Sequence, residues 1–289
     1  MTNAASPPLA VASTLPVDAE YTLTSADFER IRKLIYERAG ISLHAGKQAM
    51  VYSRLSRRLR ETRHTSFSAY LEQLERGGSE SEWQEFVNCL TTNLTAFFRE
   101  EHHFHALVDD LRALAGRAAG RPLRIWCNAA STGEEPYSLA MTVIETLGLS
   151  AQARLVCSDI DTKVLATAQR GVYPADSRGL SPERLKRHFL RGTGANSGSI
   201  RVKPELARLI EFRPFNLMSA SWSALGDPFD IVFCRNVMIY FDAPTQRKVL
   251  ERIHGVTRPG ALLYVGHSEN FTDSRDLFRL RGKTIYERV

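Results

Sequence analysis

From about residue 100 onward, short apolar runs typical of buried strands alternate with runs that have helical periodicity. The strand-like runs are Leu123–Trp126, Ala153–Ser158, Leu209–Arg213, Ile231–Phe233 and Leu262–Val265, and the helical runs are His103–Ala118, Pro136–Thr146, Lys163–Gln169 and Pro244–His254. Strands that alternate with helices predict a parallel, doubly wound α/β sheet, which binds its ligand at the carboxyl ends of the strands. The candidate site is therefore expected where the strands end.

Other segments of the chain have different patterns. Residues 1–20 are rich in Ala, Ser and Pro and predict a disordered leader, because they lack the basic start and apolar run of a signal peptide. The pattern over residues 21–90 predicts a small all-helical domain, and Ser25 with Asp27 can cap its first helix. Residues 91–102 are predicted to be a linker that contributes to the active site, followed by an α/β domain over residues 103–289. Over about 176–207 two short strands around a glycine-rich turn predict a β-hairpin, with Leu185–Leu190 as the first strand.

The net charge of +6 is concentrated in residues 41–64, which contain six basic side chains and one glutamate. A helix over about 46–63 would place its apolar side chains on one face and its arginines outside that face. Those arginines are Arg54, Arg57, Arg58 and Arg60. The cluster favours an acidic partner, which could be nucleic acid, anionic lipid or an acidic protein surface. A solvated helix face would have the same pattern.

Several residue types exclude other classes of protein. The four cysteines have no CxxC spacing, so free thiols in a reducing cytoplasm are expected rather than disulfides or a zinc site. No run of about 18 apolar residues is present, so no membrane-spanning helix is expected. The eight histidines, which include His102, His103 and His105, are interpreted as surface or packing residues rather than metal ligands.

The loop after the first strand, residues 128–137, is where a nucleotide-type cofactor would meet the sheet. It is neither a GxGxxG loop nor a P-loop, and it carries Glu134 and Glu135, which would repel phosphate. Two carboxylates suit a cofactor with an ammonium and a sulfonium group, as in S-adenosylmethionine. Alternatively, both glutamates only favour the helix dipole.

Polar side chains also follow three other strands. Asp159, at the tip of the second strand, has the position of a ribose-binding acid, and Asp161 can cap the next helix. Asn216 follows another strand, and Arg235 with Asn236 follows the apolar run Ile231–Phe233. Such groups are costly to bury without a ligand or a hydrogen-bonded network, although a solvated loop would need neither.

Five segments together resemble the CheR family of chemotaxis receptor methyltransferases. They are TTNLTAFFRE (91–100), ASTGEEPYS (130–138), SDID (158–161), FCRNVMIYF (233–241) and GHSENF (266–271), and the resemblance extends from about residue 21 to the C-terminus. It implies an all-helical N-terminal domain and a Rossmann-like methyltransferase domain with an inserted β-subdomain. It also implies S-adenosylmethionine as cofactor and glutamates on the cytoplasmic helices of chemotaxis receptors as substrates.

The resemblance also implies roles for individual residues. The family's cofactor contacts fall on Asn93, Thr95, Arg99, Glu135, Asp159, Asn216, Leu217, Arg235 and Asn236. Its receptor-facing basic helix falls on Arg54, Arg57 and Arg60. In part of the family the β-subdomain binds a short tethering peptide at the receptor C-terminus. The turn with Gly192 and Gly194 resembles that subset.

The chemistry needs neither a general base nor a metal. A glutamate carboxylate has a pKa of about 4.3 and is already a nucleophile at neutral pH. Catalysis should therefore come from aligning the reactants and excluding water, for which Arg99 and Tyr240 are the candidate residues. A cytoplasmic monomer is expected, with S-adenosylhomocysteine as product.

Two other functions remain open from the sequence. The arginine helix also suits a nucleic-acid methyltransferase, although no NPPY-like sequence follows the central strand. A catalytically silent adaptor that binds the cofactor as a signal is the second alternative.

Overall fold

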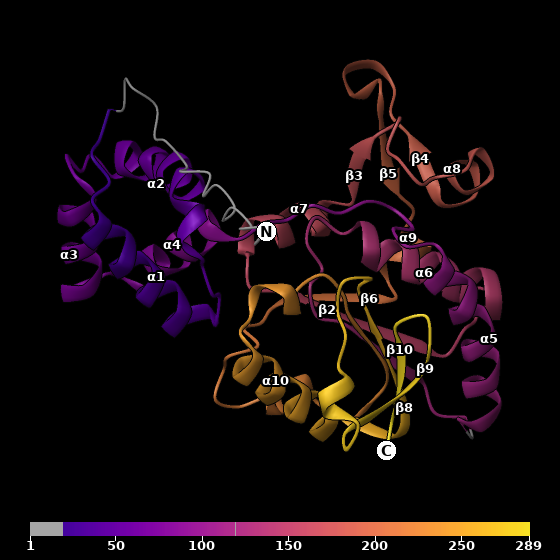
Figure 1. Cartoon of the computed structure of the whole chain (residues 1–289). Helices are drawn as coiled ribbons and strands as arrows, with labels where there is room; N and C mark the ends of the chain where they lie inside the picture. Colours follow the sequence, from indigo (N-terminus) through magenta and orange to yellow (C-terminus); the bar gives the residue numbers. More distant parts are fainter. Residues whose placement is uncertain (1–19, 119) are drawn as a thin grey trace, which may run out of the picture. The chain divides into compact units, whose positions relative to one another are not determined.

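The computed structural model describes residues 20–118 and 120–289, and these divide into two compact units between Leu90 and Thr91. Apart from residue 20, the predicted leader lies outside the described residues. No helix among the described residues is long and apolar enough to span a bilayer. Figure 1 shows both units.

The N-terminal unit is all-helical. Its helices are α1 (Ser25–Ala39), α2 (Gln48–Thr62), α3 (Phe67–Gly77) and α4 (Glu80–Leu90), with a short 3₁₀ turn η1 (Ala45–Lys47) before α2. The predicted cap of α1 was right for Asp27, whose side chain accepts from Thr24 N at 3.2 Å, and wrong for Ser25. Thr24 is the N-cap, because its extended backbone lets its hydroxyl accept from Asp27 N, while Ser25 is already helical. The predicted apolar face of α2 is confirmed, since Val51, Tyr52, Leu55 and Leu59 are all buried.

The C-terminal unit is built on a seven-stranded sheet with the order β6-β2-β1-β7-β8-β10-β9. Five strands are parallel: β1 (Leu123–Cys127), β2 (Ala153–Asp159), β6 (Ile210–Pro214), β7 (Phe229–Cys234) and β8 (Thr257–Val265). Two antiparallel strands, β9 (Phe278–Gly282) and β10 (Ile285–Arg288), complete one edge. The predicted α/β sheet is confirmed.

Helices cover both faces of this sheet because successive strand residues point to opposite sides. Ile125 and Ile231 pack with residues of α5 (His102–Arg117) and α6 (Glu134–Leu147), whereas Trp126 and Val232 pack with α10 (Ala243–Gly255). α7 (Thr162–Arg170) follows β2, and Asp161 caps it as expected. Three further 3₁₀ turns are η3 (Ser223–Leu225), η4 (Met238–Tyr240) and η5 (Thr272–Ser274).

A separate small antiparallel sheet has the order β3-β5-β4, formed by β3 (Val172–Pro174), β4 (Phe189–Arg191) and β5 (Ser199–Val202). β4 and β5 are the predicted hairpin, but β3 begins before the predicted range of 176–207. The strand predicted over Leu185–Leu190 was mostly wrong. Residues up to His188 form α8 (Pro182–His188), because Ser181 caps it and Pro182 suits its first turn. The turn holds η2 (Gly194–Asn196), and α9 (Pro204–Ala207) follows β5.

Candidate active site

The register of the parallel strands brings their polar ends to one edge of the sheet. Cys127, the last residue of β1, pairs with Cys157 of β2 and with Phe233 of β7. Asp159, two residues further along β2, pairs with Pro214 at the end of β6. The loops that follow β1, β2, β6 and β7 therefore start side by side, as expected for the ligand edge of a doubly wound sheet.

The loop after β1 begins with a buried amide that has no hydrogen-bond partner in the described structure. Asn128 is 3% exposed, and neither its Oδ1 nor its Nδ2 is bonded. Buried amides are normally paired, so an orphaned one at the ligand edge of the sheet indicates a place for a polar ligand group. Sequence analysis did not assign Asn128, although its place directly after the first strand was a usable signal.

Arg235 is the centre of the buried charges at this edge. Its Nη1 donates to Glu135 Oε2 at 2.6 Å, and its Nη2 donates to the main-chain oxygen of Arg99 at 2.6 Å and lies 3.3 Å from Glu100 Oε2. Burial opposes the charge of Glu100, but the neighbouring guanidinium holds the pKa of Glu100 below its usual value. One cation, which follows β7, therefore joins the start of α6 to the segment before α5.

The predicted ribose ligand Asp159 is buried and already accepts main-chain hydrogen bonds. Its Oδ2 accepts from Ser131 N at 2.8 Å, and its Oδ1 accepts from Asp161 N at 2.9 Å. Burial raises the pKa of Asp159 to about 6, although these bonds favour the charged form. The carboxylate is thus fixed in orientation and can titrate close to neutral pH.

The segment 91–100 lies against the same edge. Asn93 Nδ2 donates to Asp161 Oδ2 at 2.8 Å, and Asn93 O accepts from the Ser131 hydroxyl at 3.1 Å. Arg99 Nη1 donates to Leu94 O at 2.8 Å, which closes the segment on itself. Thr95 is half-buried between these anchors. The predicted residues of this segment are therefore held next to the tips of β1 and β2.

The remaining predicted residues follow β6 and β7. Asn216 is half-buried, and its Oδ1 accepts from Met218 N at 2.8 Å in a local turn. The Leu217 side chain is buried in the core with Trp126. Asn236 adopts a left-handed backbone with φ +57°, and its Nδ2 lies 3.4 Å from Glu100 Oε1. Tyr240 is half-buried at the end of η4.

Backbone strain is concentrated in these loops. Four non-glycine residues with left-handed φ values between +49° and +57° lie here: Phe98, Glu100, Ser131 and Asn236. Each such conformation costs on the order of 1–3 kcal/mol and persists only where surrounding contacts enforce it. The contacts around these loops therefore hold them in one conformation at the ligand edge of the sheet.

The donors and charges at this edge suit S-adenosylmethionine. Glu100 and Glu135 together outweigh the single charge of Arg235, so a negative charge remains for the ammonium and sulfonium groups of the cofactor. Asp159 would accept from the ribose hydroxyls, and the unpaired Asn128 amide can both donate and accept. The residues present therefore fit this cofactor.

Within the described residues, one group of side chains could approach a metal ion: Glu100, His102 and His103. Arg235 already pairs with Glu100 Oε2, the oxygen that lies 3.6 Å from His103 Nδ1. Burial and the Arg235 charge lower the pKa of His103 to about 4, and the same positive charge would repel a metal ion. His103 is buried, and its Nε2 lies 2.8 Å from the Thr284 hydroxyl; its interpretation as a packing residue stays a prediction.

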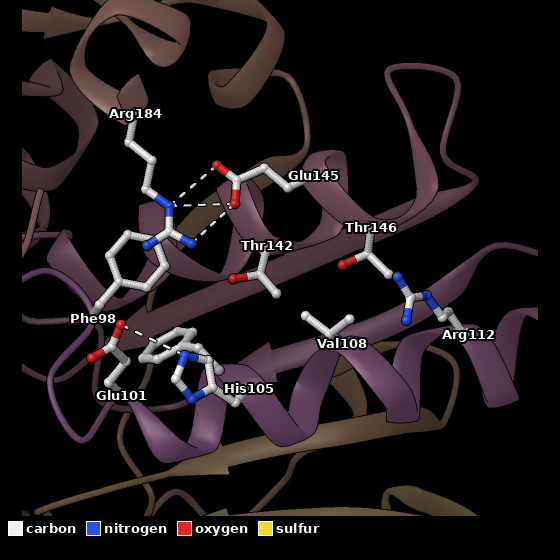
Figure 2. A pocket seen from close by; sticks show the side chains of 10 residues that line it. Phe98, Glu101, His105, Val108, Arg112, Thr142, Glu145, Thr146 and Arg184 are labelled. Atoms are coloured by element: carbon white, nitrogen blue, oxygen red, sulfur yellow. Dashed lines mark hydrogen bonds and ion pairs between the residues drawn. The ribbon is translucent and has the colours of Figure 1, made fainter. Parts of the chain in front are cut away.

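A cavity of about 130 Å³ lies between α5 and α6 (Figure 2), and none of the predicted cofactor residues lines it. Arg184 of α8 lies at its edge, where it pairs with Glu145 at 3.0 Å and stacks 3.7 Å from the centre of the Phe98 ring. Burial disfavours charge on Glu145, but hydrogen bonds from His188 and Arg184 hold the pKa of Glu145 at about 2. These contacts attach α8 to the segment that precedes Arg99.

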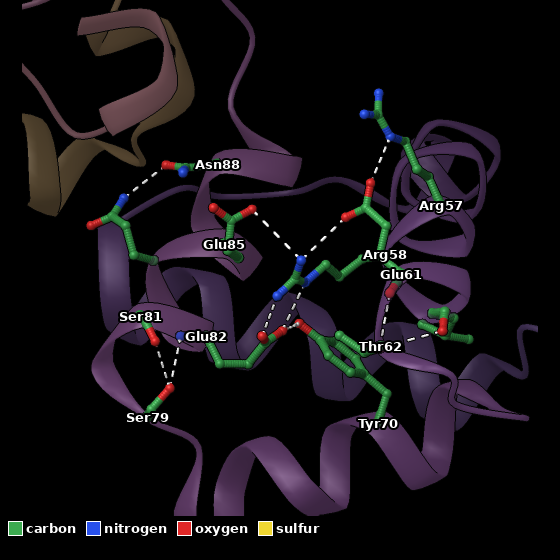
Figure 3. Close-up of polar contacts among 12 residues, drawn as sticks. Arg57, Arg58, Glu61, Thr62, Tyr70, Ser79, Ser81, Glu82, Glu85 and Asn88 are labelled. Carbon is green, nitrogen blue, oxygen red and sulfur yellow. Dashed lines mark hydrogen bonds and ion pairs between the residues drawn. The ribbon is translucent and has the colours of Figure 1, made fainter. Parts of the chain in front are cut away.

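The arginines of α2 differ in how far their charges are neutralised (Figure 3). Arg58 points inward and pairs with Glu82, Glu61 and Glu85, so its charge is used within the helical unit. Arg57 pairs with Glu61 but stays 77% exposed, and Arg60 pairs with Glu20 and is 54% exposed.

Arg54 donates to Leu90 O at 3.1 Å. The helix also has acidic neighbours that its own segment of the sequence does not contain. Glu20, Glu82 and Glu85 come to it from outside residues 41–64.

Gly192 and Gly194 lie in the turn between β4 and β5. A Cβ on Gly192 would lie 2.0 Å from Asn196 O, so no larger residue fits without rearranging the turn. Gly194 has φ +57° and open space around it. Gly192 thus has a structural reason to be glycine, and its role toward a peptide stays a prediction.

Comparison with known proteins identifies the family. Residues 93–286 match the model of the CheR methyltransferase, SAM binding domain, and residues 26–91 match that of the CheR methyltransferase, all-alpha domain. The chain is 52% identical over 267 residues to a chemotaxis protein methyltransferase of Klebsiella aerogenes, covering 91% of this chain and 90% of that protein.

It is 48% identical over 274 residues to the Escherichia coli chemotaxis protein methyltransferase, covering 94% of each chain. It is 52% identical over 269 residues to chemotaxis protein methyltransferase 2 of Pseudomonas aeruginosa, covering 92% of this chain and 94% of that protein. This chain belongs to the CheR methyltransferase family, with an all-α domain followed by an S-adenosylmethionine-binding methyltransferase domain.

Proposed function

We propose that this protein transfers a methyl group from S-adenosylmethionine to glutamate side chains of chemotaxis receptors. The products are glutamate methyl esters and S-adenosylhomocysteine. The observation that carries the proposal is the buried edge where Arg235 joins Glu135 and Glu100 beside the unpaired amide of Asn128. The names of the relatives support the chemotaxis role.

The chain's own residues would bind, orient and exclude water. The cofactor supplies an electrophilic methyl group. The residues proposed to hold it are Asn93, Thr95, Asp159, Asn216, Leu217, Asn236 and Arg235 with its partners Glu135 and Glu100. The incoming glutamate needs no base, since it is ionised at neutral pH. Arg99 and Tyr240 are proposed to orient it. The cytoplasmic helices of the receptor would bind Arg54, Arg57 and Arg60, of which Arg57 and Arg60 are exposed. A tethering peptide would bind near Gly192 and Gly194.

The direct test is a methyl-transfer assay with radiolabelled S-adenosylmethionine and receptor-rich membranes. Label that enters the receptor and is released by mild base as methanol is expected, because carboxyl methyl esters hydrolyse in base. Nuclease-sensitive label would favour the nucleic-acid methyltransferase. Cofactor binding without any transfer would favour the silent adaptor.

Arg99→Ala should lower the single-turnover methylation rate by about 10- to 100-fold at saturating cofactor, because misplaced reactants lose near-attack alignment. Thermal stability should change little, since among the described residues the side chain donates a single hydrogen bond, to Leu94 O. Arg112→Ala on the exposed side of α5 is the control. An unchanged single-turnover rate would remove Arg99 from the site.

Reversing the charge at Arg57 should reduce receptor methylation and leave affinity for S-adenosylhomocysteine unchanged. Exposed charges act mainly on encounter and register, and the Debye length falls from about 10 Å at 0.1 M salt to about 3 Å at 1 M. Initial rates for Arg57→Glu should therefore show a smaller decline with salt than wild-type rates.

Arg76→Glu is a matched control for this experiment. Arg76 is 82% exposed and pairs with Glu72 four residues away, as Arg57 pairs with Glu61, but it lies on α3. Equal rates and salt slopes for both variants and the wild type would mean that Arg57 is only a solvated residue.

A further inference from the structure

Glu269 has no role in the proposed reaction, yet its carboxylate lies under the loop that carries Arg235 and Asn236. Its Oε1 accepts from Val237 N at 3.0 Å and Met238 N at 2.8 Å. Its Oε2 accepts from Asn236 N at 2.9 Å and from Gly266 N. Glu269 is 4% exposed, and among the described residues these four main-chain donors are the hydrogen-bond partners of its carboxylate.

This arrangement is an anion nest occupied by a side chain of the same protein. Successive N–H groups of the loop after β7 converge on one carboxylate, and the left-handed backbone of Asn236 turns its N–H inward. Burial raises the pKa of Glu269 against the effect of these hydrogen bonds. A buried anion that accepts from three successive main-chain donors of one loop fixes the conformation of that loop.

The segment after β8, which contains Gly266 and Glu269, packs against Asn236. A residue larger than glycine does not fit at position 266, because its Cβ would lie 2.4 Å from Asn236 Nδ2 and 2.9 Å from Glu269 Oε2. A turn in which Glu269 N donates to Gly266 O, at 2.9 Å, brings the carboxylate to this point. The segment 266–269 is thus shaped to press on Asn236 and to hold it.

We propose that Glu269 is a positioning residue of the cofactor site, which acts by fixing the backbone of Arg235–Met238 so that Arg235 and Asn236 face the cofactor. The inference rests on the proposed function, because it assumes that these two residues bind S-adenosylmethionine. Glu269 itself touches neither cofactor nor substrate.

The test is isothermal calorimetry with S-adenosylhomocysteine on the full chain. Glu269→Gln leaves two main-chain donors facing an NH₂ group, so the loop should relax and the dissociation constant should rise about tenfold or more. Gly266→Ala is a second variant that pushes on Asn236 from the other side, at a position whose φ is not left-handed. It should weaken affinity in the same direction. Glu251→Gln, on the surface of α10, should bind as the wild type does.

A double-mutant cycle distinguishes positioning from general loss of stability. If Glu269 acts partly through Asn236, then Glu269→Gln combined with Asn236→Ala should lose less affinity than the sum of the two single losses. Additive losses would overturn the inference, as would unchanged affinity in folded Glu269→Gln or, if that variant does not fold, in Gly266→Ala. A wild-type protein that binds S-adenosylhomocysteine but leaves receptors unmethylated would overturn the proposed function and not this inference.

Discussion

Replacing Arg235 with alanine is expected to destabilise the C-terminal unit by about 3–5 kcal/mol, because it leaves buried carboxylates without their cation. Arg235 is 3% exposed, and its guanidinium is the partner of Glu135 at 2.6 Å and of Glu100 at 3.3 Å. Affinity for S-adenosylhomocysteine should become undetectable in the folded fraction. The reason is that the start of α6 and the segment before α5 lose the group that joins them.

The stability change can be assigned to the correct unit by fluorescence. Of the three tryptophans, Trp126 and Trp222 lie in the C-terminal unit and Trp83 lies in α4, so a Trp83→Phe background reports on the sheet alone. Urea unfolding of Arg235→Ala in that background measures the loss.

Arg235→Lys is the matched control, since it keeps the charge but cannot donate to Glu135 and Arg99 O in a fixed fork. Arg235→Lys should recover much of the stability and little of the affinity. Equal stability of Arg235→Ala and the wild type would show that the two carboxylates do not depend on Arg235.

Cofactor affinity is expected to rise with pH through about pH 6, because binding favours the ionised form of Asp159. The pKa of Asp159 is about 6 in the folded protein, against an ordinary value of 3.8. Ribose hydroxyls that donate to the carboxylate would lower that pKa, so binding should release a proton below pH 6. The affinity gain is then at most about tenfold per pH unit in that range.

The same titration makes a stability prediction with a defined sign. A carboxyl group whose folded pKa is raised binds protons more tightly when folded. Its contribution to stability is therefore full below the unfolded pKa near 4 and is lost as pH rises to about 6. The ligand-free protein should lose this contribution across pH 4–6, whereas the complex should not.

Asp159→Asn removes the titrating group and serves as the reference. Its affinity at pH 7.5 should be lower by about 1.5–3 kcal/mol, the worth of hydrogen bonds to a charged acceptor. Its affinity should also vary less between pH 5 and 7 than that of the wild type. Calorimetry in buffers of different ionisation enthalpy measures the released proton. Identical pH profiles for both proteins would show that Asp159 does not bind the ribose.

The sequence alone predicts the parallel strands of the C-terminal unit and the polar residues that follow them, but not α8, β9 or β10. The alternation of apolar and helical runs predicts the parallel sheet because a buried strand and an amphipathic helix have different periods, which are local properties. Polar residues at strand ends could be recognised for the same reason, and Asp159 and Arg235 lie at the predicted edge. The capping role of Asp161 was also readable, since a cap acts within three residues.

Only the tertiary structure decided which groups meet. Arg235 is 100 residues from Glu135 and 136 from the Arg99 carbonyl that it binds, and no local pattern encodes such pairs. Glu269 reaches the loop after β7 from the end of β8, so its nest depends on the packing of two strands. The neutralisation of Arg58 by Glu82 likewise needed helices α2 and α4 to be placed together. Periodicity determines what each segment becomes, whereas charge pairing and burial depend on distances that exist only once the segments have packed.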